Sequence, residues 1–191
     1  MNCLAIDTTN TRLTVVLLRD KDIFYREIEV GKSGHSALLM PTVDEVLKEG
    51  GIEVNALDTV AAVVGPGSFT GIRIGVSAMT AIAFGTGAKR IALTSFELIA
   101  YNRQSVLAAV DAGHGNIYAA ECENGKIMST SFIPFGEDVS DIKDAEYAPI
   151  CSYHEALAGV VARKLVDGEY SGVLVPFYMR KSQAERERDE V

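Results

Sequence analysis

Short apolar runs separated by polar turns fill the first thirty residues of the chain. Two such runs and one alternating run come before residue 31, a spacing typical of antiparallel strands joined by hairpins. Between residues 35 and 49 apolar positions recur at helical spacing instead. The expected elements are strands at 3–6, 13–18, 23–30, 59–64 and 90–93, and helices at 35–49, 70–84 and 95–101. Strands and helices therefore alternate after residue 35, which predicts a mixed α/β fold.

The same pattern begins again at residue 105. There an apolar run ends in Asp111, as the first run of the chain ends in Asp7, and two further strands follow in both places. The expected elements of this half are strands at 105–110, 117–122, 127–132 and 172–175, and one helix at 154–166. The chain therefore holds an internal repeat, and its second copy is incomplete.

Three antiparallel strands followed by helix, strand and helix make up a ribonuclease-H-like module. Two such modules facing each other are typical of the sugar-kinase, heat-shock-protein and actin group of ATPases. We therefore expect an α/β fold of this type with a degenerate, shortened second lobe. The expected division is an amino-terminal lobe at 1–102, a second lobe at 103–179 and a charged tail at 180–191.

Composition and charge narrow the class of protein. Of the 191 residues, 48% are hydrophobic and 23% charged, as in ordinary globular proteins. The net charge of -8 argues against a broad nucleic-acid-binding surface, which requires a basic face. We find no signal-peptide pattern and no apolar run of membrane length, so we expect a cytoplasmic protein without membrane contact. The three cysteines and three histidines are widely scattered, so we expect reduced thiols and no metal site.

A glycine-rich corner follows the strand at 59–64. Gly65 and Gly67 allow a tight turn at the carboxyl end of this strand, and Ser68 or Thr70 is expected to cap the next helix. In α/β proteins such corners border the crevice where ligands bind. The glycine spacing fits neither the dinucleotide-binding nor the Walker motif. The corner is therefore either part of a ligand site or a tight turn without a ligand.

Asp7 and Asp111 end the first strand of each lobe, where the two-lobed ATPases place the acids that meet nucleotide phosphates and their metal. Carboxylates suit a hard cation, and the hydroxyls of Thr8 and Thr9 are able to bind phosphate oxygens. This arrangement predicts an ATPase or a small-molecule kinase. Against it, Thr8 stands where the phosphate loop usually carries glycine, and the second lobe is short. The alternative is that both acids belong to ordinary turns.

Two helices carry more apolar surface than one core contact needs. The helix at 70–84 is small or apolar almost all round, which is typical of a helix buried in a core or against another chain. We therefore expect a helix-on-helix interface with a partner protein. The residues expected at this interface are Leu38, Leu39, Phe69, Ile72, Val76, Met79 and Ala83. For each of them taken singly, the core of the lobe is the alternative place.

Six short motifs are spread in order over nearly the whole chain. The most specific is Gly-Pro-Gly-Ser-Phe-Thr-Gly-Ile-Arg-Ile-Gly at 65–75. The others are Leu-Ala-Ile-Asp-Thr-Thr at 4–9, His-Ser-x-x-Leu-x-Pro at 35–41, Thr-Ser-Phe-Glu-Leu-Ile-Ala at 94–100, Val-Asp-Ala at 110–112 and Pro-Phe-Tyr-Met-Arg at 176–180. Together they resemble the TsaB family, which takes part in making threonylcarbamoyladenosine in bacterial tRNAs.

The resemblance implies a two-lobed, actin-like fold and no catalytic activity of this chain alone. TsaB proteins pair with their catalytic paralogue TsaD through two helices of the amino-terminal lobe, here 35–49 and 70–84, and the ATPase TsaE joins the pair. A homodimer is implied for the isolated chain, and contact with tRNA only through the partner. No cofactor is expected on the isolated chain. ATP or ADP is expected at the interface of the complex, close to Asp7, Thr8, Thr9, Gly65, Gly67 and Arg73.

The chain departs from the family pattern in three ways. Gly113 follows Asp-Ala where arginine is usual, Ala37 follows His-Ser where an acid is usual, and the second lobe is short. The competing interpretations are the ATPase or kinase described above and a peptidase, a label given to some relatives. The peptidase has little support, because the sequence has neither zinc-spaced histidines nor a recognisable nucleophile triad.

Overall fold

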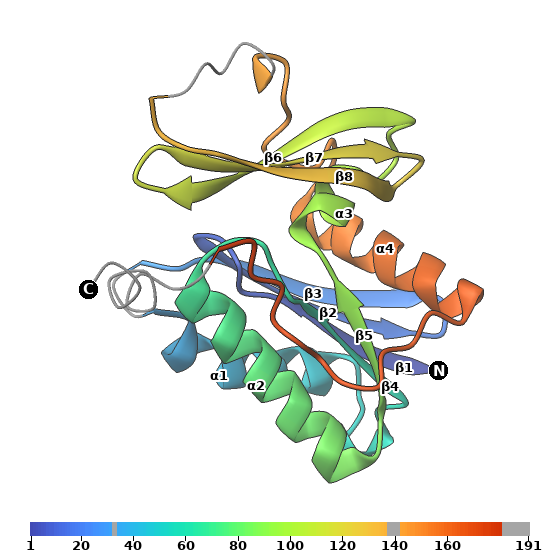
Figure 1. Cartoon of the computed structure of the whole chain (residues 1–191). Coiled ribbons are helices and arrows are strands. Elements are labelled where there is room, and N and C mark those ends of the chain that lie inside the picture. Colours follow the sequence, from blue (N-terminus) through green and yellow to red (C-terminus); the bar gives the residue numbers. More distant parts are fainter. Residues whose placement is uncertain (32–33, 137–141, 181–191) are drawn as a thin grey trace.

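A mixed five-stranded sheet forms the centre of the larger lobe in the computed structural model (Figure 1), which describes residues 1–31, 34–136 and 142–180. Its strands are β1 (Asn2–Asp7), β2 (Arg12–Arg19), β3 (Asp22–Glu29), β4 (Thr59–Val63) and β5 (Lys89–Leu93), in the order β3-β2-β1-β4-β5. β1 pairs antiparallel with β2 and parallel with β4. Hairpins therefore join the first three strands, and helical crossovers join the parallel ones. All five strands expected for the first lobe are confirmed.

The helices also follow the expected order. They are α1 (Gly34–Glu49), the short 3-10 helix η1 (Val54–Ala56), α2 (Phe69–Thr86), α3 (Ser95–Ile99) and α4 (Tyr153–Asp167). Ser68 caps α2, because its hydroxyl accepts a hydrogen bond from the amide of Gly71 at 3.2 Å. The cap of α3 is Thr94, which forms a capping box with Glu97.

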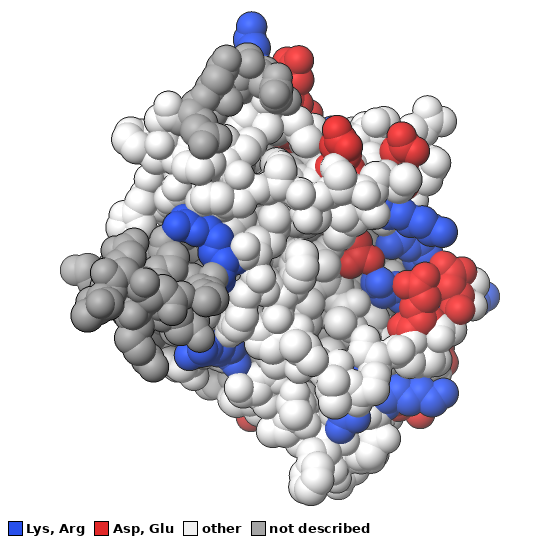
Figure 2. Space-filling model, viewed as in Figure 1, with Lys and Arg blue, Asp and Glu red and all other residues white. Residues whose placement is uncertain are grey.

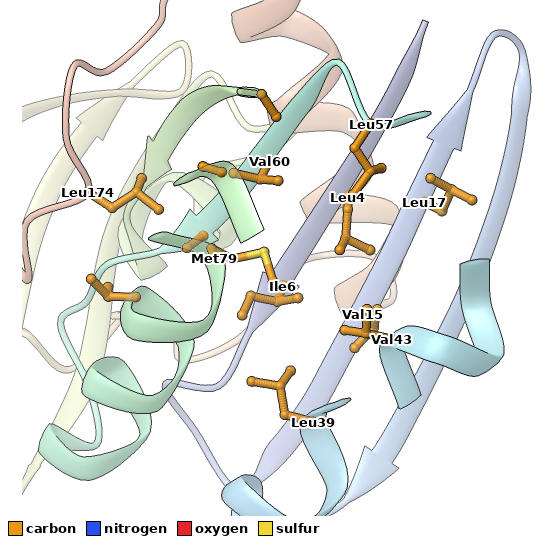
Figure 3. Close-up of a cluster of buried hydrophobic side chains, with 14 of the residues drawn as sticks. Leu4, Ile6, Val15, Leu17, Leu39, Val43, Leu57, Val60, Met79 and Leu174 are labelled. Atoms are coloured by element: carbon orange, nitrogen blue, oxygen red, sulfur yellow. The ribbon is translucent and has the colours of Figure 1, made fainter. Parts of the chain in front are cut away.

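Different helices bury the two faces of the large sheet, because successive side chains of a strand point to opposite sides. Leu4 and Ile6 of β1 lie in a core with α1 and α2 (Figure 3), whereas Cys3 and Ala5 lie in a second core with α4. The helical members of the first core that are buried are Leu39, Val43, Val46, Leu47, Ile72, Val76, Met79 and Ala83. The sheet is therefore a central layer with helices on both sides.

A separate antiparallel sheet forms the smaller lobe. Its strands are β6 (Ser105–Gly113), β7 (Asn116–Glu123) and β8 (Lys126–Ile133), in the order β6-β7-β8. One face packs on α3, where the fully buried ring of Phe96 lies in a cluster with Ala108 and Ala120. The three strands confirm the internal repeat of the hairpins predicted from the sequence.

The expected second lobe at 103–179 is wrong for its carboxyl-terminal part. Helix α4 lies along the large sheet (Figure 1), where Leu157 and Val160 are buried in the cluster that contains Ala5 and Val16. Leu174 is buried in the other core of the same lobe. The apolar pattern of these residues indicates burial, but it does not indicate which sheet buries them. Of the residues that the structure describes, the smaller lobe therefore consists mainly of the β6–β8 sheet.

One other expectation differs from the structure. Residues 172–175 form no named strand among the described residues, and an isolated bridge joins Ser171 to Arg90 at the edge of β5. Residues 181–191 of the predicted charged tail lie outside the described part of the chain.

Within the described residues, helix α2 is the one helix long and apolar enough to span a membrane by length and composition. Its 18 residues contradict the expectation that no apolar run reaches membrane length. The core helix of a globular protein passes the same test. Ile72, Met79 and Ala83 of α2 are buried against the large sheet. This packing accounts for the hydrophobicity of one side of the helix.

Candidate functional site

A cleft of about 970 Å³ lies between the two lobes. Its walls come from the loop after β1, the corner between β4 and α2, the end of β6 and residues 177–180. The corner predicted from the glycines therefore does border a cleft. Asp7, Thr9, Gly67 and Asp111 are among the lining residues.

Asp7 is buried at this cleft, and protein groups already bind its carboxylate. The carboxylate accepts hydrogen bonds from the Thr9 amide (2.8 Å), the Thr9 hydroxyl (2.7 Å) and the Asn10 side-chain amide (3.1 Å). Burial raises the pKa of Asp7, while the hydrogen bonds from Thr9 and Asn10 act in the opposite direction. Both Thr9 bonds go to Oδ1, whereas Oδ2 accepts only the bond from Asn10, so internal donors occupy most of the acceptor capacity that a cation would use.

Asp111 repeats one feature of Asp7 in the smaller lobe. It is exposed near the end of β6, and its carboxylate accepts a hydrogen bond from the amide of Gly113 at 2.7 Å. Asp7 makes the same bond to the amide two residues on, at Thr9. Both acids therefore form turns of the Asx type. They border one cleft, as the ATPase interpretation requires, but their local geometry supports the alternative that they are acids of ordinary turns.

The glycines of the corner allow the loop after β1 to pack directly on it. A Cβ added to Gly67, at a φ of 152°, would lie 2.4 Å from the carbonyl oxygen of Thr9. The same carbonyl accepts a hydrogen bond from the Ser68 amide at 2.7 Å. A Cβ on Gly71 would lie 1.9 Å from the carbonyl oxygen of Thr8. Contact between two backbone segments therefore explains these glycines, without a phosphate.

The side chains of Thr8 and Thr9 serve the same contact. The Thr8 hydroxyl donates to the carbonyl of Gly71 at 2.7 Å, and a Cβ on Gly75 would lie 2.4 Å from that hydroxyl oxygen. The Thr9 hydroxyl binds Asp7 and lies 3.1 Å from the hydroxyl of Ser95. Both threonines, predicted as phosphate ligands, thus have hydrogen-bond partners inside the protein.

Arg73 lies on the outside of α2, apart from the cleft lining in the described residues. Its guanidinium stacks on the ring of Phe69, 4.0 Å from the ring centroid, and its Nε donates to the hydroxyl of Tyr178 at 3.0 Å. Gly65 is not among the described residues that line the cleft, and a Cβ there would meet the carbonyl oxygen of Phe177 at 2.7 Å. Of the six residues predicted near a nucleotide, only Asp7, Thr9 and Gly67 line the cleft.

Most of the predicted interface residues are in the core, which corrects their assignment. The buried ones are Leu39, Ile72, Val76, Met79 and Ala83, and their exposed fractions range from 0% to 7%. Leu38 and Phe69 are half-buried. The stripe at helical spacing is the side that contacts the sheet, so the accessible surface of each helix lies outside this stripe. In the sequence, the accessible surface of α2 is indicated by the apolar residues that fall outside the stripe.

The outer α2 face consists of the apolar residues of this helix that are exposed or half-buried. Its exposed members are Ala81 and Phe84, whereas Ile74, Ala78 and Ile82 are half-buried and also pack against the core of the larger lobe. Phe84 has an exposed fraction of 87%, and the sequence has no charged residue between Ile74 and Thr86. Figure 2 shows a largely uncharged surface over α2. Met40 of α1 adds a further exposed apolar side chain.

Comparison with known proteins identifies the family. The model of the family TsaD, tRNA N6-adenosine threonylcarbamoyltransferase, matches residues 29–151. The chain belongs to this family. It is 27% identical to the tRNA threonylcarbamoyladenosine biosynthesis protein TsaB of Haemophilus influenzae, over 82% of this chain and 66% of that protein. It is 33% identical to TsaB of Bacillus subtilis, over 62% of this chain and 53% of that protein.

The solved structures support the same fold. YeaZ from Pseudomonas aeruginosa matches with a TM-score of 0.75 at 22% identity, over 93% of this chain and 99% of that one. The two-lobed α/β fold and the TsaB-family resemblance predicted from the motifs are thus confirmed. The chain spans about half to two thirds of the length of the curated TsaB proteins that it matches.

Proposed function

We propose that the chain is a non-catalytic subunit of the cytoplasmic machinery that makes threonylcarbamoyladenosine in tRNA, and that it binds and activates a TsaD-type paralogue together with TsaE. Its TsaB relatives carry this biosynthetic pathway in their names. The observation that carries the proposal is that the groups expected to bind a nucleotide phosphate and its metal are already hydrogen-bonded or packed within the protein. Asp7 accepts three hydrogen bonds from its own loop, and the Thr9 carbonyl fills the space beside Gly67.

The outer α2 face supports a role in binding a protein. An exposed phenylalanine among small apolar residues is costly to leave in water and is typical of an interface centre. Met40 suggests that α1 shares the surface, as the resemblance implies. We propose that the TsaD-type partner docks here, helix on helix. A second copy of the chain is the expected occupant when the partner is absent.

The remaining partners follow from this role. The net charge of -8 favours contact with tRNA through the partner rather than through this chain. We propose that ATP or ADP binds only in the assembled complex and that the isolated chain holds no cofactor. No group of three or more His, Cys, Asp or Glu side chains in the described ranges is close enough to hold a metal ion.

One observation favours a second candidate, the ATPase or small-molecule kinase. Asp7 and Asp111 border the same cleft, as the acids of two-lobed ATPases do. Titration of the isolated chain with magnesium and ATP tests it, with Asp7→Asn as the variant. Tight binding that the variant loses would favour the enzyme over the non-catalytic subunit.

The experiment that tests the partner surface uses two variants matched in exposure. Phe84 on α2 and Val166 on α4 both have an exposed fraction of 87%. We expect Phe84→Asp to weaken binding to TsaD of the same organism by about a hundredfold or more, because it places a charge at the centre of an apolar contact. Val166→Asp should leave the affinity, measured by calorimetry, unchanged. Equal affinities for the two variants would contradict the proposed surface.

A further inference from the structure

Residues 170–180, which we call the strap, run from the end of α4 to the cleft. At the start of the strap, the Ser171 amide donates to the carbonyl of Arg90 at 2.7 Å, so the strap is tied to the edge of β5. Further on, the Phe177 amide donates to the carbonyl of Val64 at 2.7 Å. In Figure 1 this segment, coloured orange to red, passes beside α2. The strap therefore crosses the larger lobe from the edge of its sheet to the glycine corner.

The end of the strap also contacts the smaller lobe. Phe177 packs against the cores of both lobes, and Met179 packs against the cluster formed by α3, β6 and β7. The guanidinium of Arg180 lies over the ring of Phe132 on β8, 4.1 Å from its centroid. Residues 177–180 also line the cleft. One short segment thus touches both lobes and forms one wall of the space between them.

A three-residue clasp fixes the end of the strap to α2. The ring of Tyr178 stacks on the ring of Phe69, with 4.8 Å between the centroids. The Arg73 guanidinium stacks on the same Phe69 ring, and its Nε donates to the Tyr178 hydroxyl at 3.0 Å. Phe69 and Arg73 stand one turn apart on α2 and so face Tyr178 together. The clasp consists of one aromatic stack, one cation–π contact and one hydrogen bond.

The anchors of the strap differ in burial. Leu174 is 7% exposed and belongs to the core shown in Figure 3, so it holds the middle of the strap for as long as the lobe is folded. Tyr178 is 39% exposed, and its hydrogen bond to Arg73 faces solvent. Exposed contacts of this kind are weak and exchange with water at little cost. The clasp is therefore able to open while the strap up to Leu174 stays in place.

We propose that the strap holds the two lobes at a fixed opening and that the clasp on α2 is its release point. When the clasp opens, Phe177 to Arg180 lose their support, and the smaller lobe is free to rotate about α3. Helix α2 also carries the outer face proposed for the partner. A bound partner would then keep the clasp closed and so set the width of the cleft. This consequence rests on the proposed function.

The first test follows the strap in the isolated chain by hydrogen exchange. Tyr178→Ala removes the stack and the hydrogen bond, and Tyr178→Phe removes the hydrogen bond alone. We expect exchange at the Phe177 amide to become about tenfold faster in Tyr178→Ala and less so in Tyr178→Phe. Val173→Ala is the matched control, because this strap residue is 67% exposed and outside the clasp. Equal exchange rates in all four proteins would overturn the clasp as a release point.

The second test measures the distance between the lobes directly. Spin labels are placed at Lys48→Cys on α1 and Lys126→Cys on β8, both exposed, in a Cys151→Ser background. We expect a single narrow distance distribution in this protein and a broader one when Arg73→Ala opens the clasp. An unchanged distribution would overturn the strap as the element that holds the lobes.

A third arm adds the TsaD-type partner to the labelled Arg73→Ala chain. A narrower distribution is the expected result. If the partner binds and the distribution stays broad, the coupling to the partner surface is wrong. If the partner does not bind to any version of the chain, the proposed function fails, while the two tests on the isolated chain still decide the strap.

Discussion

The two lobes begin with the same three antiparallel strands but differ in what covers them. The sheet of the larger lobe has helices on both faces, and β1 at its centre is almost wholly buried. The described part of the smaller lobe has three strands, with α3 packed on one face. Helix α4, which follows the second set of strands in sequence, is placed on the larger lobe. A repeat in the sequence therefore need not give two equal folding units.

The glycine corner of the larger lobe is where we expect the largest effect on stability. Gly71→Ala would place a Cβ 1.9 Å from the Thr8 carbonyl oxygen, a backbone atom that cannot move without the strand β1. We expect a loss of more than about 4 kcal/mol in the free energy of unfolding, measured by urea denaturation.

The matched control for this variant lies in the same helix. A Cβ on Gly85 would meet no atom within 4 Å, and its φ is not in the left-handed region. Gly85→Ala should raise the free energy of unfolding by up to about 1 kcal/mol, because alanine is the better helix former. A mild effect of Gly71→Ala would mean that the two backbone segments are not in close contact.

The position of α4 gives the next largest effect. Leu157 is fully buried against the large sheet, so Leu157→Ala should lower the free energy of unfolding of the larger lobe by about 3 kcal/mol. Val166→Ala, at an exposed position of the same helix, should change it by less than about 0.5 kcal/mol. The placement of α4 would be contradicted if Leu157→Ala loosened β6–β8 in hydrogen exchange and left β1 unaffected.

The rates at which two buried thiols react show how often each lobe opens in the native protein. Burial raises the pKa of Cys3 in the larger lobe to about 12 and that of Cys122 in the smaller lobe to about 11, so neither reacts until its surroundings open. The smaller core should open more often, and we expect a thiol reagent to modify Cys122 about tenfold faster than Cys3. Half-buried Cys151 should react before both. Equal rates for Cys3 and Cys122 would mean that the two lobes open as one unit.

The smallest effect concerns the pH dependence of stability through Asp7. Burial raises its pKa in the folded state above the ordinary 3.8. A carboxyl with a raised pKa stabilises the fold most below pH 3.8, and this contribution is lost as the pH rises through the raised pKa. The stability of Asp7→Asn relative to the natural chain should therefore increase from pH 4 to pH 8. Urea midpoints across this range measure it, and a constant difference would contradict a raised pKa.

The sequence predicted local structure well where one pattern decides it. Alternation and apolar runs located all eight strands now named in the structure, and Ser68 was one of two caps expected for α2. The predicted correspondence between Asp7 and Asp111 is also present in the structure. Each carboxylate accepts a hydrogen bond from the amide two residues further along the chain. These features depend on neighbours in the chain, which the sequence displays directly.

Long-range packing is where the sequence was insufficient. The apolar stripe of α2 predicted a contact, but Met79 and Val76 meet the sheet of their own lobe rather than a partner. Arg73 was expected near a nucleotide, and its contact with Tyr178 joins residues that are 105 positions apart. The position of α4 is a similar case, because its apolar pattern predicts that one side is buried but not which sheet it packs on. Only the three-dimensional fold decides between such surfaces.

The most direct test of the non-catalytic role is a reconstitution in which one component is left out. Formation of threonylcarbamoyladenosine on tRNA is measured with the adenylate-forming enzyme, TsaD and TsaE of the same organism. The account predicts that activity collapses without this chain and returns with the natural chain or Asp7→Asn, but not with Phe84→Asp. Activity that is the same with and without the chain, or that Asp7→Asn abolishes while still binding TsaD, would contradict it.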